Sequence, residues 1–185
     1  MHTGIERYCA LVKEANTKIN LVSRKDIDHL YDHHVLPSLL FLDLERVQAG
    51  DQILDIGSGG GFPGLVIAIM EPTIQVTVTD SIKKKADFLQ YCVKQLKLPN
   101  VKVIHGRVET IKGKQFDHVT ARAVAPVGTL YSWAKPLLRS GGTLETLKGR
   151  THAEAEVLAL GEQIDYDIIP CPDFADTVIV SVVKP

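Results

Sequence analysis

The pattern of apolar and polar positions changes near residue 50. From there on, short apolar runs typical of buried strands alternate with stretches whose apolar positions recur at helical spacing. The predicted strands are 52–56, 75–79, 101–104, 116–120 and 142–147, and the predicted helices between them are 64–70, 82–97 and 127–139. This alternation predicts a parallel sheet with helices on both faces.

The end of the chain follows a different pattern. A predicted helix over 153–160 is followed by two predicted strands, 164–169 and 177–183. The loop between these strands is too short for a crossover connection, so they can pair only in the antiparallel sense. The sequence therefore predicts an α/β, Rossmann-like fold with a mostly parallel sheet that ends in an antiparallel hairpin.

The residues before 50 show helical spacing without strand patterns. Residues 4–17 and 25–42 are predicted helices, and Pro37 is expected to kink or interrupt the second one. We therefore expect a single domain over residues 1–185, in which a helical N-terminal cap (1–49) packs on a sheet-containing core (50–185).

Composition excludes several classes of protein. With 45% hydrophobic and 23% charged residues, the chain is typical of a globular protein that has its own core. No apolar run reaches the roughly 18 residues of a membrane span, and the N-terminus lacks the apolar stretch of a signal peptide. Three widely spaced cysteines suggest neither a disulfide framework nor a zinc site. We expect a cytoplasmic protein with no metal.

The net charge of −1 is unevenly distributed. Residues 81–114 hold nine Lys and Arg against two acids, whereas residues 152–185 hold seven acids against Lys184. Residues 120–151 are also basic, with five Lys and Arg against Glu145. Such blocks can present a basic face to a polyanion, or they can be solvated helix surfaces, and charge alone leaves both open.

A glycine-rich segment, ILDIGSGGGFPGL at 53–65, joins a predicted strand to a predicted helix. Backbone N–H groups at such a turn can approach a ligand closely. The pattern G-x-G-x-x-G from Gly59 matches the dinucleotide fingerprint, while D-x-G-x-G-x-G from Asp55 matches the first motif of S-adenosylmethionine (SAM) methyltransferases. A P-loop is less consistent, since no Gly-Lys-Ser/Thr closes the segment.

Other residues favour SAM over NAD. Asp55 precedes the first glycine, where it could fix the loop or reach the methionine ammonium through water. Val108 and Glu109 follow the third strand, where they could hold adenine by an apolar contact and a hydrogen bond. Asp80, at the end of the second strand, suits a ribose in either class. The terminal hairpin is not expected of a nicotinamide-binding fold. An NAD-dependent oxidoreductase and a non-catalytic nucleotide- or RNA-binding module remain the alternatives.

The residues after the fourth strand narrow the reaction. They read TARAVAP and lack the Asx-Pro-Pro-aromatic motif typical of amino-group methylation. Cys171, a conceivable nucleophile for cytosine C5, lies in the last hairpin and is better explained as a turn or core thiol. A ring nitrogen such as guanine N7 needs neither base nor covalent step, only positioning. Arg122 and Lys148 follow the fourth and fifth strands, on the ligand side of such a sheet, and are candidates for that role.

Several motifs occur together in a specific order: NLVS, HHVLPSLL, ILDIGSGGGFPGL, VTDSIKKKADFL, HGRVE, TARAVAP and LKG. In this respect the chain resembles the RsmG (GidB) family along essentially its whole length, and the run Gly61-Phe62-Pro63-Gly64 is the most specific match. The resemblance implies a bacterial SAM-dependent methyltransferase acting on guanine N7 of 16S ribosomal RNA, free or in the 30S particle. We expect no DNA, membrane or oligomeric partner. The chain departs from the family pattern at Pro37, where an acid is usual, and at Ala121, where a serine is common.

The motif loop and the resemblance together assign the candidate site. The predicted cofactor-binding residues are Asp55, Gly57, Ser58, Gly59, Phe62, Asp80, Val108, Glu109 and Arg122. The predicted RNA-side residues are Ser23, His34 and Lys148. No catalytic acid or base is assigned, because N7 methylation needs none.

Overall fold

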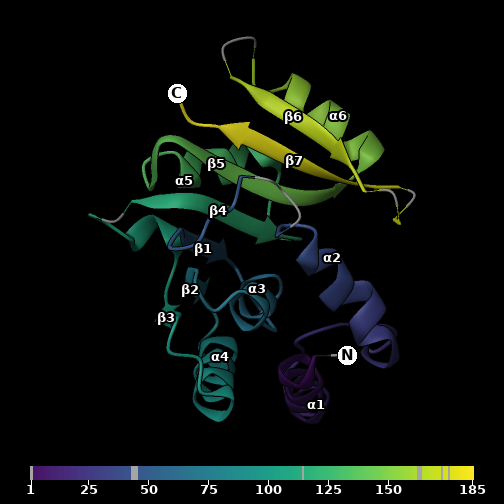
Figure 1. The fold of residues 1–185 in the computed structure, drawn as a ribbon. Helices are drawn as coiled ribbons and strands as arrows, with labels where there is room; N and C mark the ends of the chain where they lie inside the picture. The colour runs from purple at the N-terminus through teal and green to yellow at the C-terminus, as the bar shows by residue number, and fades with distance from the viewer. Residues whose placement is uncertain (1, 43–45, 114, 162–163, 172, 175) are drawn as a thin grey trace.

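The computed structural model describes residues 2–42, 46–113, 115–161, 164–171, 173–174 and 176–185. Its centre is a seven-stranded sheet with the order β3-β2-β1-β4-β5-β7-β6 (Figure 1). The strands are β1 (Gln52–Ile56), β2 (Gln75–Asp80), β3 (Val101–His105), β4 (Phe116–Arg122), β5 (Leu138–Gly149), β6 (Tyr166–Pro170) and β7 (Thr177–Val183). Strands β1 to β5 pair in parallel, and β7 lies between β5 and β6, antiparallel to both. The predicted parallel sheet with a terminal antiparallel hairpin is confirmed.

Helices cover both faces of this sheet (Figure 1). They are α1 (Thr3–Asn16), α2 (Leu36–Leu39), α3 (Gly64–Met70), α4 (Lys83–Leu96), α5 (Val127–Ala134) and α6 (Arg150–Leu158). Because side chains alternate along a strand, Ile53 of β1 joins the core under α1, α3 and α4, whereas Leu54 joins the core under α5 and α6. Across the described residues, no helix has the length and apolarity that a membrane crossing requires.

The predicted elements of the core differ from the observed ones mainly at one place. The predicted helix 127–139 ends at Ala134, and β5 begins at Leu138 rather than at residue 142. Pro136 explains the difference, because proline lacks the N–H that would continue the helix. The chain turns there, with the Leu137 N–H donating to the Ala134 carbonyl, and then pairs with Phe116 of β4.

Among the described residues of the cap (1–49), the long helix α1 is followed by short helical turns. The helix predicted over 25–42, with an interruption expected at Pro37, is observed as separate short turns: a 3-10 turn, η1 (Ile27–His29), and a π-helical turn, η2 (Tyr31–Val35), precede the four-residue α2. The expected interruption at Pro37 is confirmed. Pro37 has no N–H to donate to the carbonyl of His33, and just before it the Leu36 N–H donates five residues back, to Tyr31.

Candidate active site

The glycine loop after β1 is fixed from below by Asp55. One carboxylate oxygen accepts the Gly64 N–H at 3.0 Å, and the other accepts the Thr120 hydroxyl of β4 at 3.2 Å. The side chain is fully buried. Burial raises its pKa to about 7, against the effect of hydrogen bonds from Ser58, Gly64 and Thr120. Asp55 thus stabilises the loop and the start of α3, and its contact with a cofactor stays a prediction.

The loop is also held from the side. Asp80, at the end of β2, accepts the Gly59 N–H at 3.0 Å and the Ile82 N–H at 2.8 Å. From α1, the Tyr8 hydroxyl donates to the Gly60 carbonyl at 2.5 Å. Gly57 has a φ of +65°, and a Cβ on it would lie 2.8 Å from a methyl group of Val124. The loop conformation is therefore set by hydrogen bonds with β2 and α1, and Val124 leaves no room for a side chain at Gly57.

A cavity of about 380 Å³ opens above this loop, between the core and the cap. The residues that line it are Leu21, Val22, Asp26 and His34 of the cap, Gly57, Ser58, Gly59, Gly60 and Phe62 of the loop, and Lys85, Arg122 and Ala123. We call it the cofactor cavity. It brings together five predicted cofactor residues, Gly57, Ser58, Gly59, Phe62 and Arg122. Asp55 lies beneath it, and Asp80 lies beside Gly59.

The cap reaches the cofactor cavity through His34. The centre of its ring lies 5.0 Å from that of Phe62, and the Phe62 ring in turn lies 5.3 Å from the Tyr8 ring. Burial, and then the charge of Arg122, lower the pKa of His34 to about 4, so the imidazole is neutral at pH 7. Its Nε2 atom is buried and makes no hydrogen bond within the described part of the chain. His34 was predicted on the RNA side, and that contact remains a prediction.

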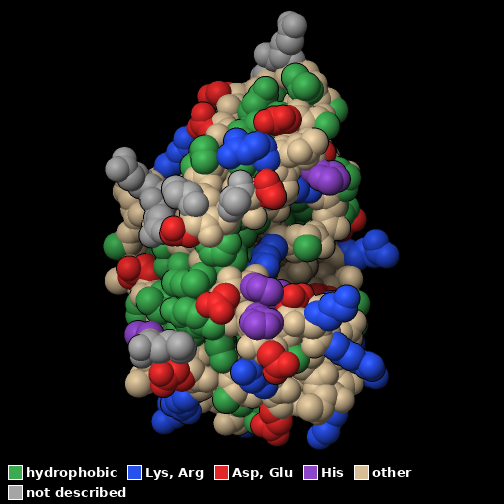
Figure 2. Space-filling model, turned by 90° about the vertical axis from the view of Figure 1, so that its right-hand side faces the viewer, with side chains coloured by type: hydrophobic (Ala, Val, Ile, Leu, Met, Phe, Trp, Pro, Cys, Tyr) green, Lys and Arg blue, Asp and Glu red, His purple; other side chains and the backbone are tan. Residues whose placement is uncertain are grey.

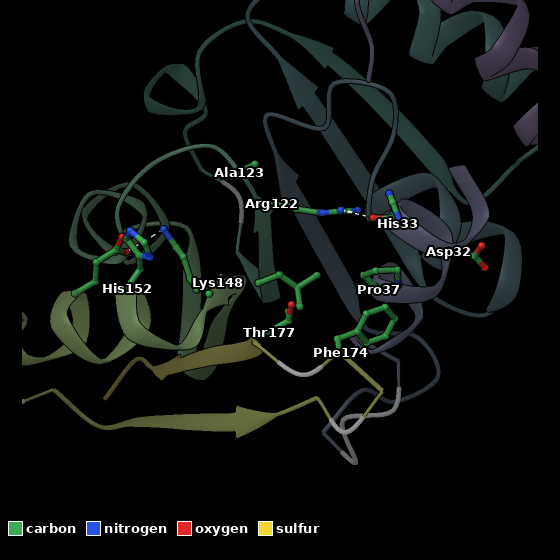
Figure 3. A pocket seen from close by; sticks show the side chains of 12 residues that line it. Asp32, His33, Pro37, Arg122, Ala123, Lys148, His152, Phe174 and Thr177 are labelled. Carbon is green, nitrogen blue, oxygen red and sulfur yellow. Dashed lines mark hydrogen bonds and ion pairs between the residues drawn. The ribbon is translucent and has the colours of Figure 1, made fainter. Parts of the chain in front are cut away.

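A second cavity, of about 530 Å³, lies between the cap, the ends of β4 and β5, and α6 (Figure 3). We call it the substrate cavity. The residues that line it are Asp32, His33, Pro37, Arg122, Ala123, Leu147, Lys148, Gly149, His152, Glu156, Phe174 and Thr177. On the face shown in Figure 2, a hollow is bordered by Lys and Arg, Asp and Glu, and His side chains. Arg122 and Ala123 line both cavities, so the cofactor cavity and the substrate cavity are adjacent.

Arg122 joins the end of β4 to the cap. Its guanidinium donates to the carbonyl of His33 and, at 3.3 Å, to that of His34 (Figure 3). Among the described residues, no carboxylate forms an ion pair with it, although the more distant Asp26 opposes the lowering of its pKa by burial. The guanidinium of Arg122 donates to two neutral carbonyls, and these do not neutralise its charge. It can therefore still bind an anion.

Lys148 lies on the opposite wall of the substrate cavity. Its ammonium group is 2.9 Å from a carboxylate oxygen of Glu156 and donates to the Ala125 carbonyl at 2.8 Å. The same Glu156 oxygen accepts the Val127 N–H at 2.7 Å, at the start of α5. In Figure 3 Lys148 lies beside His152, across from Arg122. The predicted RNA-side lysine is therefore held in place by α6.

The remaining predicted residues lie further from these cavities. The register of β2 with β3 pairs Asp80 with His105, which places Val108 and Glu109 just beyond the same edge of the sheet, in η3 (Val108–Thr110). Val108 is buried and Glu109 is exposed. Ser23 is exposed and donates to Asp26 at 2.6 Å. Cys171 is buried, and burial raises the pKa of its thiol, as expected of a core residue rather than a nucleophile.

Two charged residues that line the cofactor cavity, Asp26 and Lys85, were not predicted as site residues, and neither were the uncharged Leu21, Val22, Gly60 and Ala123. Lys85 belongs to the lysine run 83–85, whose high charge suggested only a solvated surface with incidental phosphate contacts. Asp26 follows the NLVS motif by three residues and carries no signal of its own. No group of three or more His, Cys, Asp or Glu side chains that could hold a metal occurs within the described ranges.

The strand order and the glycine loop define the class of the protein. Fibrillarin from Aeropyrum pernix, solved with natively bound SAM, superimposes with a TM-score of 0.62 at 19% identity, covering 80% of this chain and 74% of fibrillarin. The sheet is parallel except for its last two strands, with the antiparallel β7 inserted beside β5. The motif D-x-G-x-G-x-G begins at the end of β1. Together these features define the fold of a class I SAM-dependent methyltransferase. A nicotinamide-dependent oxidoreductase is not favoured.

The sequence matches the GidB family, described as rRNA small subunit methyltransferase G, over residues 1–169, and the chain belongs to this family. A relative from Thermobifida fusca named Ribosomal RNA small subunit methyltransferase G is 39% identical over 153 residues, 82% of this chain and 63% of the relative. One of the same name from Halorhodospira halophila is 40% identical over 169 residues, 90% of this chain and 79% of the relative. The chain thus spans less than two thirds of the Thermobifida protein. The resemblance inferred from the motifs is confirmed.

Proposed function

We propose that this chain transfers a methyl group from SAM to N7 of a guanine in 16S ribosomal RNA, and that it does so in the cytoplasm. The observation that supports this most is the pair of neighbouring cavities that share Arg122 and Ala123. One is bordered by the glycine loop of a methyltransferase, and the other is large enough for a base and carries basic side chains. Such an arrangement suits transfer between two bound ligands.

The residues of the cofactor cavity fit SAM. The loop between Gly57 and Gly60 presents backbone to the cavity, and the unsatisfied Nε2 of His34 and the guanidinium of Arg122 can take part in polar contacts with a ligand. We expect Asp80, at the end of β2, to bind the ribose, and Glu109, in η3 just beyond β3, to bind the adenine. When bound, SAM would supply an electrophilic methyl group on its sulfonium: the N7 lone pair would bond to the methyl carbon, and the electrons of the broken S–C bond would stay on sulfur.

The substrate cavity contributes positioning rather than acid–base chemistry. Guanine N7 has no proton to remove, so the chain has only to hold the base with N7 toward the cofactor cavity. Arg122 and Lys148 lie on opposite walls of the substrate cavity, and arginine and lysine suit the N7 and O6 edge of guanine. We expect these two residues to orient the base.

The test is transfer of tritiated methyl from SAM to 16S RNA, as free RNA and as 30S particles from a strain that lacks the protein. The modified nucleotide is then mapped by cleavage at 7-methylguanosine. We expect one methylated guanine N7 in at least one substrate form. Label at a different atom would refute the proposed chemistry. SAM binding without transfer to either form would favour a non-catalytic RNA-binding module.

The substitution Lys148→Ala tests whether the two cavities have different roles. We expect it to lower kcat/KM for RNA at least tenfold while changing the Kd for SAM by less than about twofold, because Lys148 lines only the substrate cavity. Steady-state methylation and calorimetric titration measure the two quantities. Lys135→Ala, which removes the same charge at the end of α5, serves as the control. Equal losses in RNA methylation and SAM affinity would contradict the assignment of Lys148 to the RNA side.

A further inference from the structure

Asp26 places a carboxylate from the cap on the wall of the cofactor cavity. It lies just before η1, where two neighbours orient it by hydrogen bonds and Nε2 of His34 lies 3.9 Å from its Oδ2. The Ser23 hydroxyl donates to Oδ2 at 2.6 Å, and Nδ1 of His33 lies 3.0 Å from Oδ1. The side chain remains 36% exposed, so the oxygens can still accept a hydrogen bond from a ligand.

The charges around the cofactor cavity are unequal. Lys85 and Arg122 are the basic residues among those described that line it, and Asp26 is the acidic one. His34 adds no charge at pH 7, because its pKa is lowered to about 4. Asp55, the acid of the glycine motif, is fully buried beneath the loop, with both oxygens bonded to protein. A cationic ligand group in the cavity therefore has Asp26 as its nearest lining carboxylate.

We propose that Asp26 binds the α-ammonium group of the methionine part of SAM, with Arg122 placed to take its α-carboxylate. This inference rests on the proposed function, since it assigns a residue to the same cofactor. An α-amino acid carries one positive and one negative group on a single carbon, and it is recognised best by an acid and a base that face one cavity. Asp26 and Arg122 meet that requirement. They also interact with each other, since the charge of Asp26 opposes the lowering of the Arg122 pKa.

The consequence is that the cap completes the cofactor site. Asp26 and His34 come from the cap, whereas the glycine loop, Lys85 and Arg122 come from the core. The cap would therefore contribute to cofactor affinity through a specific charge, in addition to any role in binding RNA.

Three ligands separate the possible roles of Asp26. SAM carries the ammonium and the sulfonium, S-adenosylhomocysteine carries the ammonium alone, and 5′-methylthioadenosine carries neither. We expect Asp26→Asn to weaken SAM and S-adenosylhomocysteine about tenfold or more, and to leave 5′-methylthioadenosine within about twofold, measured by isothermal titration calorimetry. Asp28→Asn, an exposed acid two residues away, is the matched control and should change none of the three.

Each other outcome overturns the inference. Equal weakening of all three ligands would mean that Asp26 only supports the fold of the cap. Weakening of SAM alone would place the sulfonium, not the ammonium, at Asp26, and no weakening would remove Asp26 from the site. His33→Ala keeps the carboxylate but removes one of its partners, and it should retain the preference for S-adenosylhomocysteine over 5′-methylthioadenosine. Failure of the unmodified protein to bind any of the three would instead refute the proposed function.

Discussion

At the residue scale, the glycine loop depends on a carboxyl group that has no contact with solvent. Asp55 accepts hydrogen bonds from Gly64 and Thr120, and burial raises its pKa to about 7 from an ordinary value of 3.8. The folded protein therefore holds a proton on Asp55 at pH values where the unfolded chain has lost it. By linkage, this group stabilises the fold less as the pH rises from about 4 to about 7, and its contribution is constant above that.

Asp55→Asn tests this pH dependence. The amide can still accept from Gly64 and cannot ionise, so the free energy of unfolding should fall less steeply between pH 4 and pH 7.5 than in the unmodified protein. At about 1.4 kcal/mol per pKa unit, the free energy of unfolding of the unmodified protein should fall over this range by at most about 4 kcal/mol more than that of the variant. Urea denaturation at several pH values measures it. The exposed Asp165→Asn should keep the original slope, and parallel curves for Asp55→Asn would show that Asp55 does not titrate in this range.

Asp55 and Asp26 differ in how much of their role could be predicted from the sequence. The position of Asp55 before the first glycine predicted either a loop-fixing or a ligand-binding role, and the structure places it beneath the loop with both oxygens bonded. Asp26 was missed because it reaches the cofactor cavity only through tertiary packing of the cap, on which local sequence has no bearing. The same holds for the contact of Arg122 with the carbonyls of His33 and His34, which joins residues 88 and 89 positions apart.

At the element scale, the cap and the core are connected where helical hydrogen bonding fails. Pro37 cannot donate to His33, and the guanidinium of Arg122 donates to that carbonyl instead. The strands of the core were predictable because most are short, near-continuous apolar runs, as expected where both faces of a sheet are covered. The succession of short turns within 25–42 was not predictable, since apolar spacing cannot distinguish one helix from a 3-10 turn and a π-helical turn in succession.

Arg122→Ala should therefore reduce the local stability of the cap segment 31–39, which contains η2 and α2. We expect amide hydrogen exchange across 31–39 to accelerate about tenfold or more, because hydrogen bonds from a charged donor to two carbonyls of this segment are lost. Exchange in β1 and β2 should change little. Arg139→Ala removes a surface ion pair with Asp117, 2.6 Å long, and should leave 31–39 unchanged. Acceleration spread evenly over the chain would mean that Arg122 supports the whole fold rather than the cap.

At the scale of the whole molecule, the sheet separates two basic regions. Lys84 lies in the first turn of α4, next to the strand ends that border the cofactor cavity. Lys135 follows the last residue of α5, on the other sheet face and at the opposite edge, because α5 begins at the end that carries Arg122. The variants Lys84→Ala and Lys135→Ala each remove one positive charge. They therefore have the same net charge and differ only in the position of the missing lysine.

This pair decides which face of the molecule meets RNA. Each phosphate neutralised by a lysine releases counterions, so binding weakens linearly in log salt with a slope of about 0.7 to 0.9 per contact. If the cavity-bearing edge contacts the RNA backbone, Lys84→Ala should make this slope shallower by about one contact, and Lys135→Ala should not change it. Filter binding of 16S RNA at four salt concentrations measures both slopes. Equal slopes for the two variants would mean that the lysine run 83–85 is a solvated surface, and a shallower slope for Lys135→Ala alone would place the RNA on the other face of the sheet.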